Sequence, residues 1–308
     1  MIVVRLEGGL GNQLFQYSYG LELQAKYGGR LLFDRHAVRN DSRKENVIEN
    51  LVDLEPRSTF DSLCIFLLAA YAGLQIRMFS ALFGKTRETS ACLAKVGVHH
   101  CFDSRYTALR VPQLPFLFLH GNFMSGKYFE SASDLVRASI HAERVLGDKH
   151  QETVSRIRCS NSVAVHVRRG DYLEERWRSK LHVCTEIYYE TAVQIALNEL
   201  ESPKFFVFSN SEEDTNWVRE NYRFMPEGTE FVSPALNDFE HFALMSECRH
   251  FIIANSTFSW WSSYLSRNQD KLIIAPKPWN RAGWDMTDLY SEDWVVIDVD
   301  HDKVMVGA

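Results

Sequence analysis

The residues best suited to bind a charged group follow the apolar segment SVAVHV. Arg168, Arg169 and Asp171 come directly after it, and His166 lies within it. Side chains alternate along a strand, so His166 and Arg168 should share one face. An arginine guanidinium presents a planar set of donors that matches phosphate oxygens. We therefore expect Arg168 to bind an anion, whereas Arg169 fits an ion pair with Asp171 equally well.

A second candidate site is the segment NSTFSWW, which follows the apolar run HFIIA. A helix that begins there would expose backbone N–H groups and the positive end of its dipole, an arrangement that suits phosphate. Hydroxyl side chains at this position can cap the helix or bond an anion directly, and the two tryptophans behind them should lie in the core. The residues that we expect to contact the ligand are Asn255, Ser256, Thr257, Phe258 and Ser259.

Two further corners carry neutral hydrogen-bonding groups. Ser209 and Asn210 follow the apolar segment KFFVF, and Asn12 lies in GGLGNQ, directly after the first apolar segment. Side-chain amides can bind sugar hydroxyls and phosphates without adding charge, whereas the bland alternative is a helix cap with glycines that the turn requires. The other residues of this corner that we predict to bind substrate are Gly9, Gly11 and Gln13.

The elements that must position these residues alternate between strands and helices. Ile2–Leu6, a helix over about 12–27 and Leu31–Asp34 predict one βαβ unit. From about residue 150, five apolar segments alternate with helical segments, a pattern typical of a doubly wound parallel sheet. We predict an α/β protein with two Rossmann-like domains facing a cleft, an N-terminal domain over 1–155 with a helical insertion and a C-terminal domain over 156–308.

Composition and charge exclude several functions. The 308 residues have a formal net charge of −6 and no basic stripe, so we expect no nucleic-acid partner. The Asp-x-Asp within DVDHD lies close to the end of the sequence, where a solvated tail is expected. With no other cluster of hard-cation ligands, we expect no metal.

The most apolar stretch is LCIFLLAAYAGLQI, residues 63–76. It is shorter than the roughly 20 residues that a spanning helix needs, so a buried helix is the favoured interpretation. The basic and aromatic residues that follow leave peripheral membrane contact as the alternative.

These motifs together resemble the bacterial α-1,2-fucosyltransferases of glycosyltransferase family 11. The similarity is carried by GGLGNQLFQYSYG, HVRRGDY, FSNSEEDTNWVREN, LMSECRHFIIANSTFSWWSSYLS, IIAPKPW and EDWVVI, in the order of the family. Residues 36–112 match poorly. The family commonly has an aspartate in the helix before LMSEC, where this sequence has His241 beside Glu240.

The resemblance implies a GT-B-like fold with the acceptor side in 1–155 and the GDP-sugar site in 156–308. It implies inverting transfer of L-fucose from GDP-β-L-fucose to the 2-hydroxyl of a terminal galactose, with no metal or other cofactor. Arg168 would hold the pyrophosphate, and Asn12 would lie near the donor. The residues that would shape the donor site or contact the nucleotide are His166, Arg169, Asp171, Ser256, Thr257 and Phe258.

Several alternatives stay open from the sequence alone. The base could be His166, Asp171, Glu7 or Glu240, or a water chain could accept the proton late. Another GDP-sugar or linkage, or a non-catalytic GDP-sugar-binding or glycan-binding protein, fits the same motifs, whereas the missing GxGxxG disfavours a dehydrogenase. We expect a cytoplasmic protein, peripheral at the inner membrane where a lipid-linked galactose-terminated acceptor would lie.

Overall fold

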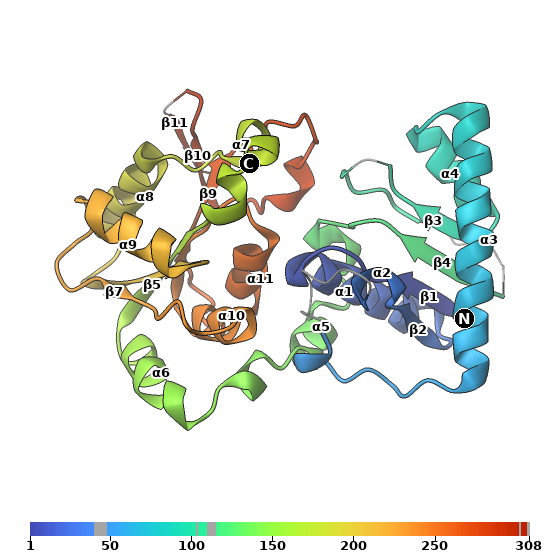
Figure 1. Ribbon diagram of the computed structural model, residues 1–308, viewed down its shortest axis with the longest axis horizontal. Helices are drawn as coiled ribbons and strands as arrows, with labels where there is room; N and C mark the ends of the chain where they lie inside the picture. The colour runs from blue at the N-terminus through green and yellow to red at the C-terminus, as the bar shows by residue number, and fades with distance from the viewer. Residues whose placement is uncertain (40–47, 103, 110–114, 302, 307–308) are drawn as a thin grey trace. The chain divides into compact units, whose positions relative to one another are not determined.

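The computed structural model describes residues 1–39, 48–102, 104–109, 115–301 and 303–306, without the side chains of Arg39, Asp171, Lys303 and Val306 (Figure 1). The chain divides into two compact units. Unit 1 comprises Met1–His141 with Thr287–Leu289, and unit 2 comprises Ala142–Met286 with Tyr290–Ala308.

Unit 1 is built on a four-stranded parallel sheet. Its strands are β1 (Ile2–Arg5), β2 (Leu31–Asp34), β3 (Val98–His100) and β4 (Leu117–His120), in the order β2-β1-β4-β3. The predicted βαβ unit and the strand before Gly121 are therefore confirmed. The helices and short turns of unit 1 are α1 (Leu10–Tyr27), α2 (His36–Arg39), η1 (Ile48–Asn50), α3 (Thr59–Phe83), α4 (Arg87–Lys95), η2 (Gly126–Tyr128), α5 (Ser133–Ser139) and η6 (Thr287–Leu289).

Unit 2 is built on a seven-stranded sheet in the order β11-β10-β9-β8-β5-β6-β7, parallel except for the β10–β11 pair. Its strands are β5 (Asn161–Val167), β6 (Pro203–Ser209), β7 (Glu230–Phe231), β8 (His250–Ile252), β9 (Ile273–Lys277), β10 (Val295–Asp298) and β11 (Lys303–Val306). Its helices and turns are η3 (Ala142–Val145), η4 (Asp148–His150), α6 (Gln151–Arg158), η5 (Gly170–Leu173), α7 (Glu175–Leu181), α8 (Glu186–Glu199), α9 (Glu212–Asn221), α10 (Asp238–Ser246) and α11 (Thr257–Leu265).

The two faces of β5 have different partners. Val163, Val165 and Val167 pack into an apolar core with Tyr188 and Tyr189 of α8. The alternate residue His166 faces α11, where its ring lies 5.6 Å from that of Phe258. Because each strand is covered on both faces by helices, the sequence reads as apolar runs rather than alternation. The predicted α/β class, with two Rossmann-like units on parallel sheets, is confirmed.

The structure divides the chain at 141/142, whereas the sequence placed the division at 155/156. The segment before β5 belongs to unit 2 because its side chains bind there. His150 Nε2 lies 3.1 Å from Glu240 Oε1, and Arg156 Nε donates to Glu230 at 2.8 Å.

Two sequence expectations are corrected by the structure. The DVDHD segment was expected to be a solvated tail, but Asp298 ends β10, which pairs with β11 at the sheet edge; Asp302 lies outside the described residues. The apolar stretch at 63–76 was expected to be a buried helix. It lies within α3, but only 11 % of the apolar window of this helix is buried. The apolar run is longer than one face of a helix needs, so one side contacts the sheet while the other stays exposed.

Candidate functional site

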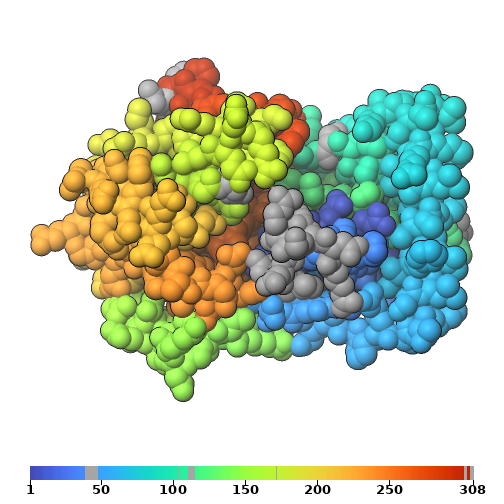
Figure 2. All heavy atoms as spheres, viewed as in Figure 1, coloured from blue at the N-terminus to red at the C-terminus, as the bar shows by residue number. Residues whose placement is uncertain are grey.

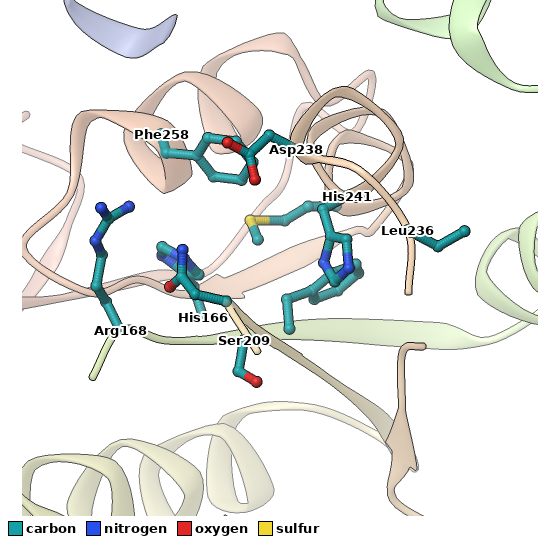
Figure 3. A pocket seen from close by; sticks show the side chains of 10 residues that line it. His166, Arg168, Ser209, Leu236, Asp238, His241 and Phe258 are labelled. Carbon is teal, nitrogen blue, oxygen red and sulfur yellow. The ribbon is translucent and has the colours of Figure 1, made fainter. Parts of the chain in front are cut away.

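A pocket of about 390 Å³ lies at the carboxyl ends of β5 and β6 in unit 2 (Figure 3). This is the edge of a parallel sheet at which ligands bind. Figure 3 shows Arg168 at one end of the pocket and Leu236 at the other, with His166, Phe258 and His241 between them. The residues that line the pocket are His166, Arg168, Phe208, Ser209, Asn210, Leu236, Asp238, His241, Met245 and Phe258.

Arg168 is placed by an aromatic neighbour. Its guanidinium carbon lies 5.1 Å from the ring centroid of Tyr172, and the Tyr172 hydroxyl donates to the Asn255 carbonyl at 3.1 Å. This contact links the end of β5 to the loop before α11. Arg168 is partly exposed in the pocket, so the predicted shared face of His166 and Arg168 is confirmed.

His166 forms a neutral floor of the pocket. Burial, followed by the charges of Arg168 and His241, lowers the pKa of His166 to about 3. Within the described part of the chain, no group hydrogen-bonds to the buried His166 Nδ1. A neutral imidazole with an unused nitrogen can exchange a hydrogen bond with a ligand without opposing an anion at Arg168.

The corner before α11 uses most of its polar groups for its own structure. The Ser256 hydroxyl caps the helix by accepting from Phe258 N at 3.3 Å. Asn255 Nδ2 donates to the carbonyls of Leu181 and Trp279, each at 2.9 Å, and both Asn255 and Ser259 are buried.

Two predicted contacts at this corner are therefore corrected. Asn255 joins the end of α7 to the loop after β9, and the Ser259 hydroxyl donates to the Ala254 and Ser256 carbonyls at 3.4 and 3.3 Å. Both side chains are committed because the turn needs partners for its buried carbonyls. Thr257 lies half-buried in the first turn of α11, and Phe258 is the corner residue that lines the pocket.

Arg169 lies in a different cavity from Arg168. Its guanidinium carbon is 3.3 Å from the Trp217 ring centroid, and its Nε is 3.6 Å from Asp214 Oδ1. Asp214 also accepts from Gly170 N at 3.0 Å. The sequence paired Arg169 with Asp171, but the partner that the structure gives it is Asp214. The backbone of Asp171 lies in η5, and its side chain lies outside the described residues.

Ser209 and Asn210 both line the pocket, as their place after β6 predicts. The Ser209 hydroxyl lies 2.7 Å from Thr215 Oγ1, so part of its bonding capacity holds the start of α9. Asn210 is exposed.

Five of the lining residues were not predicted: Phe208, Leu236, Asp238, His241 and Met245. Asp238 and His241 follow β7, a strand whose exit was not searched for chemistry because it is only two residues long. The signal was present in the sequence, since Asp238 begins the helix that carries His241. His241 Nε2 lies 3.0 Å from the Ser233 carbonyl, and burial lowers its pKa.

Glu240 points to different partners from its neighbours on α10. It accepts from Asn237 N at 2.9 Å, and Lys149 Nζ and His150 Nε2 lie 2.6 and 3.1 Å from its Oε1. This carboxylate is therefore engaged in holding the start of α10 to η4.

The GGLGNQ corner belongs to unit 1. Gly9 is the N-cap of α1, and Gly8 has φ +80°, where a Cβ would come within 2.6 Å of Asn12 Nδ2. Gln13 donates to the Gly8 carbonyl at 3.0 Å and accepts from Ile48 N at 3.3 Å, so its predicted ligand contact is corrected to a structural role. Gly11 is buried in the first turn of α1, and Asn12 is partly exposed there.

A carboxylate–imidazole pair lies at the carboxyl edge of the unit 1 sheet. Glu7 Oε2 is 3.4 Å from His120 Nε2, and the hydrogen bond from His120 lowers the pKa of Glu7. His100 Nδ1 in turn lies 2.8 Å from the His120 carbonyl. Glu7 is half-buried, so an ionised carboxylate stays accessible there.

The described residues contain no group of three or more His, Cys, Asp or Glu side chains placed to hold a metal ion. A reaction without metal remains a prediction.

Comparison with known proteins gives two relatives that span nearly the whole chain. The alpha-1,2-colitosyltransferase of Escherichia coli is 27 % identical over 304 residues, 97 % of this chain and 99 % of that protein. The O-antigen biosynthesis glycosyltransferase WbnK of E. coli is 26 % identical and covers 94 % of this chain and 98 % of its own. The galactoside alpha-(1,2)-fucosyltransferase 1 of Saimiri boliviensis boliviensis is 32 % identical over 169 residues, 49 % of this chain and 43 % of that protein.

Among solved structures, the similarity is distant. The fucosyltransferase NodZ from Bradyrhizobium has a TM-score of 0.48 at 12 % identity, over 85 % of this chain and 90 % of its own. A mutant of Arabidopsis thaliana FUT1 in complex with GDP has a TM-score of 0.48 at 13 % identity, over 90 % and 71 %. The family model is decisive: glycosyl transferase family 11 matches residues 1–298, and the chain therefore belongs to glycosyltransferase family 11.

Proposed function

We propose that the protein is an inverting glycosyltransferase that moves L-fucose from GDP-β-L-fucose to the 2-hydroxyl of a terminal β-galactose. The observation that carries the proposal is the unit 2 pocket, where the Arg168 cation, the neutral His166 and the Phe258 ring meet beyond β5. Family membership supports glycosyl transfer, and the galactoside alpha-(1,2)-fucosyltransferase 1 relatives support fucose and a galactoside.

The pocket offers matching groups for the two ends of a guanosine diphosphate. Arg168 supplies forked donors for phosphate oxygens. Asp238 supplies carboxylate acceptors, which suit the N1–H and 2-amino donors of guanine. Phe258, whose ring packs on Phe242 at 5.3 Å between centroids, is held rigid enough to support a flat base or a sugar face.

The chemistry needs a stabilised leaving group and an acceptor that loses its proton. The bond from fucose C1 to the phosphate oxygen breaks, and the galactose O2 bonds to C1 from the opposite face. Arg168 would offset the charge that develops on the departing GDP, an interaction stronger in the transition state than in the ground state.

The contacts narrow the choice of base. Glu240 is held by Lys149, His150 and the N-cap of α10, and its carboxylate serves the fold. A pKa of about 3 makes His166 a poor proton acceptor at neutral pH, because efficient bases have a pKa near the working pH. Glu7 keeps an ionised, half-buried carboxylate beside His120.

A second candidate donor is the GDP derivative of colitose, because the relative that spans 97 % of this chain is named an alpha-1,2-colitosyltransferase. Colitose is fucose without its 3-hydroxyl. The two donors therefore differ only in whether a protein group must bond that hydroxyl, and buried polar groups left unpaired by the deoxy sugar would disfavour it.

The test is incubation of the full chain with GDP-fucose or the GDP derivative of colitose and a panel of β-galactosides, followed by NMR of the product. We expect an α-1,2 linkage to galactose, faster transfer of fucose, and unchanged turnover in EDTA. Tight GDP binding with neither transfer nor donor hydrolysis would instead identify a binding protein. Another linkage or another nucleotide-sugar used in preference would contradict the assigned substrates.

We further propose that the protein works in the cytoplasm on a lipid-linked glycan at the inner membrane. The support is the expected surface-polysaccharide acceptor and the name of WbnK, an O-antigen biosynthesis glycosyltransferase. Cell fractionation tests this location, since activity confined to a secreted fraction would contradict it.

A further inference from the structure

The outer side of α3 is the largest unexplained surface of unit 1. Eight of the fourteen exposed large apolar side chains of the described residues lie on this one helix, with exposed fractions of 43–69 %. They include Phe60, Phe66, Leu67, Leu74, Leu82 and Phe83. Figure 1 shows α3 along the unit 1 sheet, and Figure 2 shows its residues at the surface. Contiguous apolar surface of this kind marks an interaction site.

The inner side of α3 is tied to unit 1 along its length. Asp61 is buried and pairs with Arg30, and the Tyr71 hydroxyl donates to the Val96 carbonyl at 3.0 Å. Ile65 and Ala72 belong to the apolar core over the sheet. The helix is long and apolar enough to cross a membrane, but spanning would remove these side chains from the core. The contacts therefore favour a helix that lies flat on a surface.

The charges around this helix identify the chemistry of the partner. Within residues 59–95 the exposed charged side chains are Arg77, Lys85, Arg87, Glu88 and Lys95, which sum to +3, while the whole chain carries −6. Because Asp61 is buried and paired, Glu88 is the single exposed acid in this range. A second copy of the same surface would bring cations together. An anionic lipid surface would attract them, at about 1 kcal/mol for each lysine or arginine near it.

We propose that α3 is a monotopic membrane anchor: its outer apolar face inserts among the acyl chains, and the basic residues at its carboxyl end bind anionic lipid headgroups. A helix with apolar residues on its outer side and cations at one end has the features of interfacial helices, whose binding depends on both apolar area and anionic lipid. The proposal does not depend on which sugar the protein transfers.

Flotation of the full chain with vesicles tests the proposal. We expect binding to phosphatidylcholine vesicles that contain phosphatidylglycerol, weaker binding without it, and release as salt is raised. Phe66→Gln and Leu74→Gln should each lower vesicle partitioning about tenfold, because each removes one inserted apolar side chain. Arg77→Glu with Lys85→Glu should remove the preference for anionic lipid.

Leu135→Gln is the matched control, since Leu135 is an exposed leucine of unit 1 on α5 and should leave partitioning unchanged. Circular dichroism and GDP titration of each variant check that the fold is kept. Absence of vesicle binding by the wild-type chain would overturn the proposal. So would α3 variants that bind vesicles normally, or a concentration-dependent dimer in light scattering that the same variants abolish, which would assign the face to a second copy.

Discussion

Arg168 and Arg169 are neighbours in sequence, yet they lie in different cavities. Strand alternation sends Arg168 to the side of His166 and Arg169 to the side of Val167, where α8 and α9 pack. Arg169 is stacked on Trp217 and paired with Asp214, so its charge is used within unit 2.

We expect Arg168→Ala to lower kcat about 10²–10³-fold, the range for removing one preorganised donor to a developing negative charge. Arg168→Lys should also be slow, because an ammonium cannot replace a planar fork of donors. Initial rates with GDP-fucose and a β-galactoside measure the effect. Arg169→Lys is the control and should stay within a few-fold of wild type. Equal losses at the two positions would refute the assignment of the donor site to Arg168.

Asp238 should recognise guanine. Asp238→Asn replaces one acceptor oxygen with a donor, and we expect GDP affinity to fall about tenfold. Inosine diphosphate lacks the 2-amino group, so its affinity should fall less. Isothermal titration of both nucleotides measures the difference, with the exposed Asp270→Asn as a control. An equal loss for both nucleotides would remove the 2-amino group from the contact.

At the scale of elements, the start of α11 depends on one hydroxyl. Ser256 caps the nine-residue helix through Phe258 N, and Phe258 lines the pocket. The dipole of this helix favours an anion near its first turn. The cap therefore affects the position of a pocket residue as well as the stability of the helix.

Ser256→Ala should lower the free energy of unfolding by about 1 kcal/mol, the usual cost of losing a serine cap. Ser256→Thr keeps a weaker cap and should cost less. Urea unfolding measures the stability, and GDP titration measures binding. If Ser256→Ala weakens GDP binding while unfolding is unchanged, the hydroxyl contacts the nucleotide rather than the helix.

At the scale of the whole molecule, the two units exchange segments along the chain. Thr287–Leu289 belongs to unit 1, where Asp288 accepts from Tyr106 N at 2.9 Å and its carbonyl accepts from Ser125 Oγ at 2.7 Å. A fragment that ends at residue 141 or 155 would leave these groups without Asp288. Unit 1 is therefore completed only after most of unit 2 has been made.

Both units bury histidines that stay neutral. Burial lowers the pKa of His99 and of His100 to about 4 in unit 1, and that of His166 to about 3 in unit 2. Below the usual pKa of 6.5, the unfolded chain binds protons that the native chain does not bind. Stability should therefore fall as pH falls from about 6.5 to 4, by up to about 1.4 kcal/mol per pH unit for each histidine.

Urea unfolding between pH 7 and pH 4.5 measures this slope. His99→Gln should make the slope shallower even if it lowers the stability at pH 7, because one proton-linked group is gone. The exposed His301→Gln should leave the slope unchanged. A slope that His99→Gln does not alter would assign the acid sensitivity to other groups.

The sequence by itself determined the features that depend on local order. The apolar segments, their alternation with helices and the parity of His166 and Arg168 follow from the period of two residues in a strand and 3.6 in a helix, so they could be predicted without tertiary contacts. The same holds for the buried tryptophans of α11.

Only the tertiary structure decided how polar groups were shared out. Asn255 bonds carbonyls 74 and 24 residues away, and Asp214 serves Gly170 from 44 residues away. Whether an amide or carboxylate is free for a ligand depends on these distant partners, because every buried polar group of the fold must be satisfied first. The exposure of α3 was decided in the same way: the sheet is wide enough to cover one side of that helix, and an apolar sequence cannot show which side is left uncovered.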